Sequence, residues 1–334
     1  MEHSTVLVIG ACGAVGRILV RELLDRGHSV VGVDRRQWPG LVPDGLSLHR
    51  IGVDKRPFED LFRVHKPQQV AHVGLVSSPG ISMDKRYEHN VVGMQRVVAL
   101  CGHYGVRRLV VLSRGTVYGA DLRNPVLLNE DAPLRGASHH SGLRDIVEAD
   151  ILAQSLAIRE PSLSVAILRP ANVVGPRVRN TMVGYLRLPV VPTLLGYDPM
   201  LQFIHEEDLV RALRLALASD VPGVFNVPGP GAVPLSAVLR TLAARSLPLL
   251  LPFFGPVVET LWRRGLSPAP LPHVDYLRYP CLLDGSRVAE VLTFRPEWSL
   301  SATIESIRPR RRPHEELTDM FRTKQEGDPT VVQP

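Results

Sequence analysis

The sequence predicts an α/β protein in which a doubly wound parallel sheet carries a smaller, irregular lobe toward the C-terminus. Three observations favour this fold class. Short apolar runs alternate with helical segments in the first half of the chain, a glycine-rich turn follows the first run, and prolines become frequent after residue 170. Strands that alternate with helices require right-handed crossovers, which give a parallel sheet covered on both faces.

The expected elements follow one another in regular order. The first strand, at residues 5–9, is rich in β-branched residues, and the helix after it has an apolar face formed by Val15, Ile18, Leu19 and Leu23. Further strands are expected at residues 29–33, 46–51, 69–73, 109–112 and 165–168, and helices at residues 58–64, 84–104 and 141–158. A strand-helix unit at residues 201–218 is expected to return to the first lobe.

Composition excludes several classes of protein. The chain has 334 residues, of which 45% are hydrophobic and 22% charged, so it is neither disordered nor fibrous. The apolar stretch at residues 246–258 is too short to cross a bilayer, and the first ten residues have no basic region or cleavage site, so we expect a cytoplasmic protein. The cysteines, Cys12, Cys101 and Cys281, are odd in number and far apart, which fits neither a disulfide framework nor a metal cluster.

The charge of the chain is carried mainly by arginine. The net charge is +6, and of the 39 basic residues only Lys55, Lys66, Lys85 and Lys324 are lysines. A basic balance is compatible with nucleic acid or an anionic lipid surface, but the arginines are spread along the chain and aromatic residues make up only 5%. We therefore expect no nucleic-acid partner and attribute the charge to a site for a phosphate-bearing small molecule.

The glycine-rich turn at residues 10–16 lies between the first strand and its helix. Gly10 allows the tight turn, Gly13 lets backbone approach a pyrophosphate, and Gly16 lets the helix pack closely on the strand. The helix N-terminus then presents N–H groups and partial positive charge to the phosphates. The turn predicts a Rossmann-type dinucleotide site that includes Gly10, Gly13, Ala14, Val15 and Gly16.

Asp34 ends the second expected strand, 18 residues after Gly16. Its carboxylate is placed to accept hydrogen bonds from the adenosine ribose hydroxyls. The same carboxylate would repel a 2′-phosphate, whereas Arg35 and Arg36 could attract one. The pattern therefore favours NAD as cofactor, with NADP as the alternative.

These elements divide the chain into two lobes that interleave in sequence. We expect residues 1–170 and about 201–222 to form the dinucleotide-binding domain. Residues about 171–200 and 223–307 are expected to form a substrate lobe, because prolines interrupt regular elements there. Residues 308–334 contain three consecutive arginines and no sustained apolar face, and we expect a mobile tail.

The GxxGxxG spacing and the motifs after it resemble the extended short-chain dehydrogenase/reductase family, the NAD-dependent sugar-nucleotide epimerases and dehydratases. The resemblance runs from about residue 6 to residue 307 and includes segments 53–54, 70–74, 87–93, 117–119, 168–176, 203–208, 284–287 and 294–296. It implies that Asp54 contacts adenine, that Val53 and Gly74 belong to the cofactor site, and that Asn90 and Tyr118 are structural. It also implies a homodimer through the helices at 84–104 and 141–158.

The chain departs from the family's catalytic set of Ser or Thr, Tyr and Lys. The position of the Ser holds Arg114, the position of the Lys holds Arg144, and the position of the Tyr holds His140. No other alignment restores the set, because there is no lysine between Arg86 and Thr323. The resemblance therefore implies the fold and the cofactor more strongly than it implies the chemistry.

Other side chains could take over parts of this chemistry. Arg144 keeps a positive charge that could hold the nicotinamide ribose, and His140 could act as acid or base near neutral pH. Ser113 or Thr116, beside the missing hydroxyl, could donate to a substrate carbonyl. A polar loop that enters a helix is an equally simple interpretation of His140 and its neighbours.

On the substrate side, Asn172 matches the family's substrate-contacting Asn. Arg177, Arg179 and Arg278 could bind a diphosphate through bidentate guanidinium contacts, and a solvated surface is the alternative for Arg177 and Arg179. The apolar segment 247–254, followed by Trp262 and two arginines, is compatible with an ordinary core segment, a lid over an apolar ligand or a membrane-surface contact.

Two functions of different classes remain open. In the first, the protein is an enzyme that carries out epimerase, dehydratase or reductase chemistry on a hydroxyl-bearing, nucleotide-linked substrate, with His140 as acid or base. In the second, it is a cofactor-binding sensor or complex partner without turnover. An intact glycine motif beside a degenerate catalytic set is compatible with both.

Overall fold

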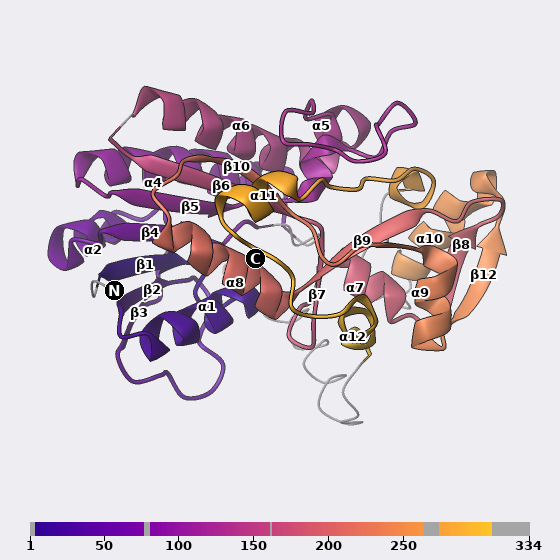
Figure 1. Ribbon diagram of the computed structural model, residues 1–334, viewed down its shortest axis with the longest axis horizontal. Coiled ribbons are helices and arrows are strands. Elements are labelled where there is room, and N and C mark those ends of the chain that lie inside the picture. Colours follow the sequence, from indigo (N-terminus) through magenta and orange to yellow (C-terminus); the bar gives the residue numbers. More distant parts are fainter. Residues whose placement is uncertain (1–3, 77–80, 161, 264–273, 309–334) are drawn as a thin grey trace, which may run out of the picture.

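A seven-stranded parallel sheet forms the centre of the larger lobe (Figure 1). The computed structural model describes residues 4–76, 81–160, 162–263 and 274–308. The strand order is β10-β6-β5-β4-β1-β2-β3. The strands are β1 (Thr5–Ile9), β2 (Ser29–Val33), β3 (Leu46–His49), β4 (Gln69–His72), β5 (Arg108–Leu112), β6 (Ser164–Pro170) and β10 (Gly223–Val227).

Helices cover both faces of this sheet, as the alternation of strands and helices predicts. They are α1 (Ala14–Asp25), α2 (Pro57–His65), α3 (Met83–Tyr87), the π-helix η1 (Glu88–Val92), α4 (Gly93–His103), α6 (Arg144–Arg159), α8 (Glu206–Ala218) and α11 (Ser286–Val291). In β1, Val6 and Val8 pack with α1 and α8, whereas Leu7 and Ile9 pack with α2 and α4. The fold class expected from the sequence is therefore confirmed.

The smaller lobe contains two short sheets and its own apolar core. A three-stranded sheet has the order β11-β9-β7, and β12 pairs with β8. The elements are β7 (Asn172–Val174), α7 (Thr181–Leu186), β8 (Val190–Leu194), β9 (Met200–His205), β11 (Ala232–Pro234), α9 (Leu235–Leu242), β12 (Arg245–Leu249), α10 (Leu251–Arg263), η4 (Val274–Leu277) and α12 (Leu300–Glu305). Phe203, Val238 and Phe254 lie in the core of this lobe.

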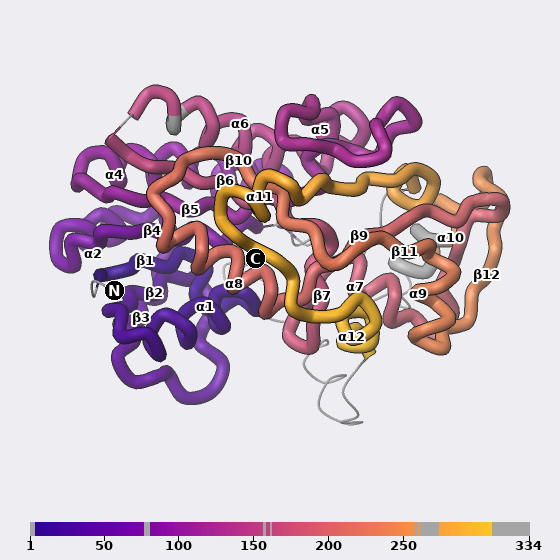
Figure 2. The backbone as a smooth tube through the Cα atoms, viewed as in Figure 1, coloured from indigo at the N-terminus to yellow at the C-terminus, as the bar shows by residue number. Residues whose placement is uncertain are grey.

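Two strands differ from the expected division of the chain. Residues 223–227 were expected in the substrate lobe, but β10 pairs with β6 and ends the large sheet. β9 was expected with the first lobe, but it pairs with β7 and β11, and only α8 after it packs on the large sheet. Both differences arise because the chain changes lobe between neighbouring elements, as the colours of Figure 2 show. The expected mobile tail, apart from Arg308, lies outside the described residues.

The segment 119–143 connects the large sheet to α6. It contains the short helix α5 (Gly136–His139) and the 3₁₀ turn η3 (Ser141–Leu143), and the 3₁₀ turn η2 (Gly115–Tyr118) precedes it. Tyr118 Oη donates to Asn226 Oδ1 at 2.7 Å, and Asn226 Nδ2 donates to the carbonyl of Leu128 at 2.9 Å. These buried bonds anchor the segment to β10.

The apolar segment 247–254 does not form a uniform core segment. Phe254 is buried, but Leu247, Leu250, Leu251 and Phe253 are exposed. The side chains of Trp262 and the two arginines after it lie outside the described part of the chain. Within the described residues, the helices are too short or too polar to span a membrane.

Candidate functional site

A cavity of about 1730 Å³ lies at the carboxyl ends of the central strands. Its walls come from the glycine turn, from the segments after β4 and β5, and from the smaller lobe. Open parallel sheets bind ligands at this edge, where the strand order reverses. The volume exceeds the 300–1,000 Å³ that is usual for a site with one small ligand, so the cavity has room for a dinucleotide and a second molecule.

The glycine turn has the close backbone packing that a dinucleotide site requires. Gly10 has φ +89°, and a Cβ added there would lie 2.5 Å from Gly74 Cα. A Cβ on Gly16 would lie 2.1 Å from the Gly10 carbonyl oxygen, so only glycine lets α1 approach the strand this closely. Gly13 is the N-cap of α1 and lines the cavity together with Ala14 and Val15. The first-turn N–H groups of α1, which have no intrahelical partners, lie at this wall.

Asp34 is buried at the cavity wall, and its carboxylate is already well bonded. Oδ2 accepts from Cys12 N at 3.0 Å and from Arg36 Nη2 at 3.0 Å. Oδ1 accepts from Arg36 N at 2.9 Å and from Arg36 Nε at 3.1 Å. The hydrogen bonds that Arg36 donates to the Asp34 carboxylate hold the pKa of Arg36 above its usual value, although burial opposes this. Ribose hydroxyls that bind here would share the carboxylate with Arg36.

Beyond Asp34, the cavity is lined by Arg35, Val53, Asp54 and His89. Burial, and then the positive charge of Arg35, lower the pKa of His89 to about 4. The imidazole is therefore neutral at physiological pH and can serve as a flat, uncharged wall for an adenine ring. Together with the glycine cradle, these residues fit the adenosine half of NAD, as the sequence led us to expect.

Ser113 lines the cavity, but its hydroxyl proton is donated to Asp150 and not toward a substrate, contrary to expectation. Ser113 Oγ donates to Asp150, whose carboxylate also accepts from Arg169 Nη2 at 2.5 Å and from Arg169 Nε at 3.0 Å. The hydroxyl proton is therefore held by a buried ion pair. Thr116 differs, because its Oγ1 is buried at the cavity wall and has no hydrogen-bond partner among the described residues.

His140 lines the cavity between α5 and η3, and Arg144 does not. A Cβ added to Gly142 would lie 2.9 Å from His140 Nε2, so the ring packs over this glycine. The Arg144 side chain is 70% exposed and its Nε donates to Glu148 Oε1 at 2.7 Å, one turn further along α6. The expected contact of Arg144 with the nicotinamide ribose is therefore not supported, because this ion pair keeps the guanidinium on the solvent face of the helix.

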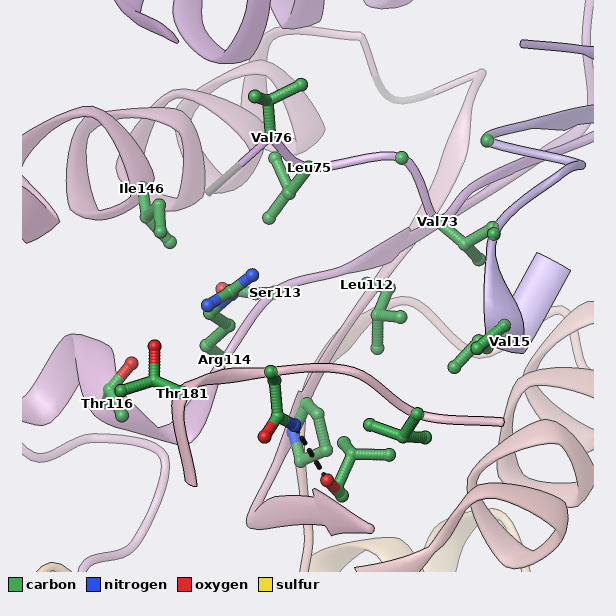
Figure 3. Close-up of a pocket in the computed structure, with 18 of the residues that line it drawn as sticks. Val15, Val73, Leu75, Val76, Leu112, Ser113, Arg114, Thr116, Ile146 and Thr181 are labelled. Carbon is green, nitrogen blue, oxygen red and sulfur yellow. Dashed lines mark hydrogen bonds between the residues drawn. The ribbon is translucent and has the colours of Figure 1, made fainter. Parts of the chain in front are cut away.

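Arg114, which we expect at the position of the family's Ser, lines the cavity, and the charge of a second arginine, Arg86, acts on it. Figure 3 shows the Arg114 side chain in the space between Ile146 and Leu112. Arg86, from α3, is buried and donates through Nη2 to Asp145 Oδ1 and to the carbonyl of Gly142, each at 2.7 Å. Asn90 Nδ2 donates to the other oxygen of Asp145 at 2.6 Å, which gives Asn90 the structural role that the resemblance implies.

Of the four expected substrate residues, Asn172 and Arg179 line the cavity, whereas Arg177 and Arg278 do not. Asn172 Nδ2 donates to the carbonyl of Gln202 at 3.0 Å. Arg177 pairs instead with the buried Glu206, with Nη1 and Oε1 2.9 Å apart. Arg278 packs over the rings of Tyr197 and Tyr279. Both arginines are held by neighbouring side chains, which a sequence pattern does not reveal.

The smaller lobe contributes other polar groups to the cavity that the sequence did not single out as site residues. They are Arg187, Tyr276 and Tyr279, which line the cavity. Tyr276 Oη donates to the carbonyl of Thr116 at 2.8 Å, and burial raises the pKa of this phenol. These residues are far apart in the sequence and belong to no motif with a recognisable spacing, so only the fold shows that they line the same cavity.

Comparison with known proteins identifies the family. The model of the NAD dependent epimerase/dehydratase family matches residues 6–228. The chain therefore belongs to this family, which confirms the resemblance seen in the sequence. An uncharacterized protein of Mycobacterium tuberculosis (strain H37Rv) is 32% identical over 91% of this chain and 82% of the relative. A UDP-glucose 4-epimerase of Arabidopsis thaliana is 24% identical over 74% of this chain and 83% of the relative.

Solved structures share the fold over nearly the whole chain. MoeE5 in complex with UDP-glucuronic acid and NAD is 24% identical, with a TM-score of 0.72, and the match covers 96% of this chain and 99% of that one. The UDP-glucose 4-epimerase of Thermotoga maritima with UDP-glucose is 19% identical, with a TM-score of 0.70, over 96% of this chain and 100% of that one. At these identities the likeness establishes the fold.

Proposed function

We propose that this protein is an NAD-dependent enzyme that oxidises, epimerises or dehydrates a hydroxyl-bearing, nucleotide-linked substrate. The observation that carries the proposal is the single cavity that runs from the glycine turn to Asn172, Arg179 and Arg187 of the smaller lobe. It is large enough for two ligands, and its substrate end carries guanidinium groups that suit a diphosphate. NAD, when bound, supplies a hydride acceptor.

The groups that could move a proton are His140 and Thr116. Both line the cavity, and neither is tied into the Ser113–Asp150–Arg169 cluster. An imidazole can accept a hydroxyl proton near neutral pH, and a threonine hydroxyl can pass a proton or hydrogen-bond a substrate oxygen. In this proposal His140 is the acid or base and Thr116 positions the reacting oxygen.

The test is turnover of UDP-glucose, UDP-galactose and UDP-glucuronic acid with NAD, followed by chromatography of the sugar nucleotides and by absorbance of NADH. His140→Ala should lower turnover by roughly 10²-fold or more, the usual contribution of a general acid or base, without changing NADH affinity. The matched control is His139→Ala, because His139 lies beside Asp121 and outside the cavity lining.

The alternative is a sensor that binds NAD without turnover. Two observations favour this alternative: the Ser113 hydroxyl donates to Asp150 of a buried ion pair, and the Arg144 side chain is exposed to solvent. Tight NADH binding with no conversion of sugar nucleotides, alcohols or ketones by the wild type would establish it and refute the enzymatic proposal.

A further inference from the structure

Six apolar side chains form one wall of the cavity. Ile146 and Leu283 are 1% and 2% exposed and belong to one buried cluster, and the other four pack against that cluster. In Figure 3 the side chains of Leu75 and Ile146 point into the same space. The six residues, called the apolar wall below, are Leu75, Leu143, Ile146, Ala171, Cys281 and Leu283.

The apolar wall lies beside the two residues to which the proposed function gives proton transfer. A Cβ added to Gly115 would lie 2.8 Å from Leu283 Cδ1, and Gly115 directly precedes Thr116. On the other side, the N–H of Leu143 donates to the carbonyl of His140 at 2.9 Å. A substrate that reacts at Thr116 and His140 therefore meets the apolar wall.

Three polar side chains around the apolar wall are bonded to the protein itself. Gln202 uses both ends of its amide on Leu283, because Nε2 donates to the carbonyl at 3.2 Å and Oε1 accepts from the N–H at 2.9 Å. Tyr276 Oη donates to a backbone carbonyl of η2 at 2.8 Å, and Ser113 Oγ donates to Asp150. These bonds direct the three side chains to the protein, whereas each hydroxyl of a sugar ring needs a hydrogen-bond partner once it leaves water.

We propose that the apolar wall binds an apolar group of the substrate, an alkyl chain or an aliphatic ring, next to the carbon that bears the hydroxyl. Such a group needs no hydrogen bonds and gains free energy by leaving water. Arg114, between Ile146 and Leu112 in Figure 3, puts a charged group at the border of this space, which suits an oxygen carried on an apolar group.

The inference rests on the proposed function, because it concerns the second ligand of the same cavity. It narrows the reacting part of that ligand from a polyhydroxylated sugar to a hydroxyl or carbonyl group on an aliphatic skeleton. The diphosphate end of the proposed substrate is unchanged.

The experiment measures the binding of 2-butanone, 2-hexanone and 2-octanone by calorimetry, with and without NADH. These ketones share one polar oxygen and differ only in the length of the alkyl chain. They are titrated into wild type, Leu143→Asn, Leu143→Met and the control Leu122→Asn, which changes a leucine that is 78% exposed and outside the cavity lining. Leu75→Asn repeats the test on another part of the apolar wall. The melting temperature shows whether each variant is folded.

Binding to the wild type should tighten by about tenfold for every two CH₂ groups, because each one is removed from water against the apolar wall. Leu143→Asn and Leu75→Asn should reduce this ratio to about threefold or less, since a polar amide replaces part of the apolar wall. Leu143→Met should keep most of the ratio, because methionine is apolar and of similar volume. Leu122→Asn should keep the wild-type ratio.

Equal affinity of the wild type for the three ketones, no binding of any of them, or the same ratio in every variant would refute the apolar site. Turnover of UDP-sugars alongside such a result would leave the proposed function intact. Conversely, a chain-length dependence that is lost in Leu143→Asn or Leu75→Asn, in a protein that converts no alcohol, ketone or sugar nucleotide, would support the apolar site and refute the enzymatic proposal.

Discussion

At the scale of single residues, Gly13 combines two properties of the cofactor site. It is the N-cap of α1 and lines the cavity, and a Cβ added to it would lie 3.2 Å from both Arg36 Nη2 and the Gly10 carbonyl oxygen. One methyl group would therefore require small shifts of both the Arg36 side chain and the Gly10 carbonyl, and a branched side chain would in addition occupy the space proposed for the pyrophosphate.

We expect Gly13→Val to abolish NADH binding while the protein remains folded. Fluorescence titration measures the affinity, and circular dichroism with thermal melting measures folding. Gly40→Val is the control, because Gly40 is an exposed loop glycine outside the cavity lining, with open space around it. Its positive φ predicts a lower melting temperature for this variant, and its NADH affinity should stay at the wild-type value. Wild-type affinity in Gly13→Val would contradict the assignment of the phosphate turn.

We expect Asp34 and Arg36 to set the choice between NADH and NADPH. The carboxylate alone would repel a 2′-phosphate, and the guanidinium of Arg36, bonded to both of its oxygens, cancels much of that repulsion. We expect the wild type to bind NADH more tightly than NADPH, and Arg36→Ala to weaken NADPH by about tenfold while NADH changes little. Arg63→Ala, in an exposed pair on α2, is the charge-matched control. An unchanged ratio of the two affinities would show that Arg36 does not contribute to the choice.

At the scale of secondary-structure elements, one buried cluster joins α6 to the two strands beside it. Asp150 of α6 accepts from Arg169 of β6 and from Ser113 just after β5, and the Asp150 and Arg169 side chains are 0% and 1% exposed. Arg169 Nη1 also donates to Tyr118 Oη at 2.8 Å. Because these groups are sealed from water, removal of one charge leaves the other without compensation.

Asp150→Asn should lower the free energy of unfolding by about 3–5 kcal/mol, since it leaves the Arg169 charge buried without its partner. Urea denaturation measures the loss. The double variant Asp150→Leu/Arg169→Met should recover a large part of it, and Asp60→Asn, in an exposed pair, should change stability by less than about 1 kcal/mol. A loss in Asp150→Asn no greater than in Asp60→Asn would argue against this role.

At the scale of the whole molecule, we expect one buried and one half-buried histidine to make the fold sensitive to acid. Burial, and then His89, lower the pKa of His72 to about 4, and that of His89 is also about 4. Unfolded histidines titrate near 6.5, so between about pH 6.5 and 4 the unfolded chain binds more protons than the native one. The contribution of these histidines to stability is therefore complete above about pH 6.5 and is lost as the pH falls toward 4.

For His72, which is 1% exposed, the slope is at most about 1.4 kcal/mol per pH unit within this range. Urea denaturation at pH 7.5, 6 and 5 should show His72→Val with a shallower fall in stability than wild type, whatever its absolute stability. Parallel curves for the two proteins would mean that His72 is protonated equally well in both states.

The sequence predicted the parts of the molecule that depend on local pattern. The glycine turn, Asp34 and the strands at residues 5–9 and 29–33 could be placed because spacing and β-branched runs determine them. The partners of β9 and β10, the orientation of Arg144 and the bonding of Ser113 could not, because each depends on a neighbour distant in sequence. Arg86 and Asp145 lie 59 residues apart in the sequence, and only the folded chain shows that they form a buried ion pair.

The late position of β10 in the chain has a consequence for biosynthesis. β6 ends at Pro170, and the strand that covers its outer edge begins only at Gly223, after the chain has passed through β7, β8 and β9. At the usual 5–20 residues per second, a ribosome needs roughly 3–10 s to make the intervening 52 residues. During that interval β6 presents unpaired backbone groups, which can pair with another nascent chain. The sheet of the larger lobe is therefore completed only after β7, β8 and β9 have been made. The risk of pairing with another nascent chain is highest while these strands are being synthesised.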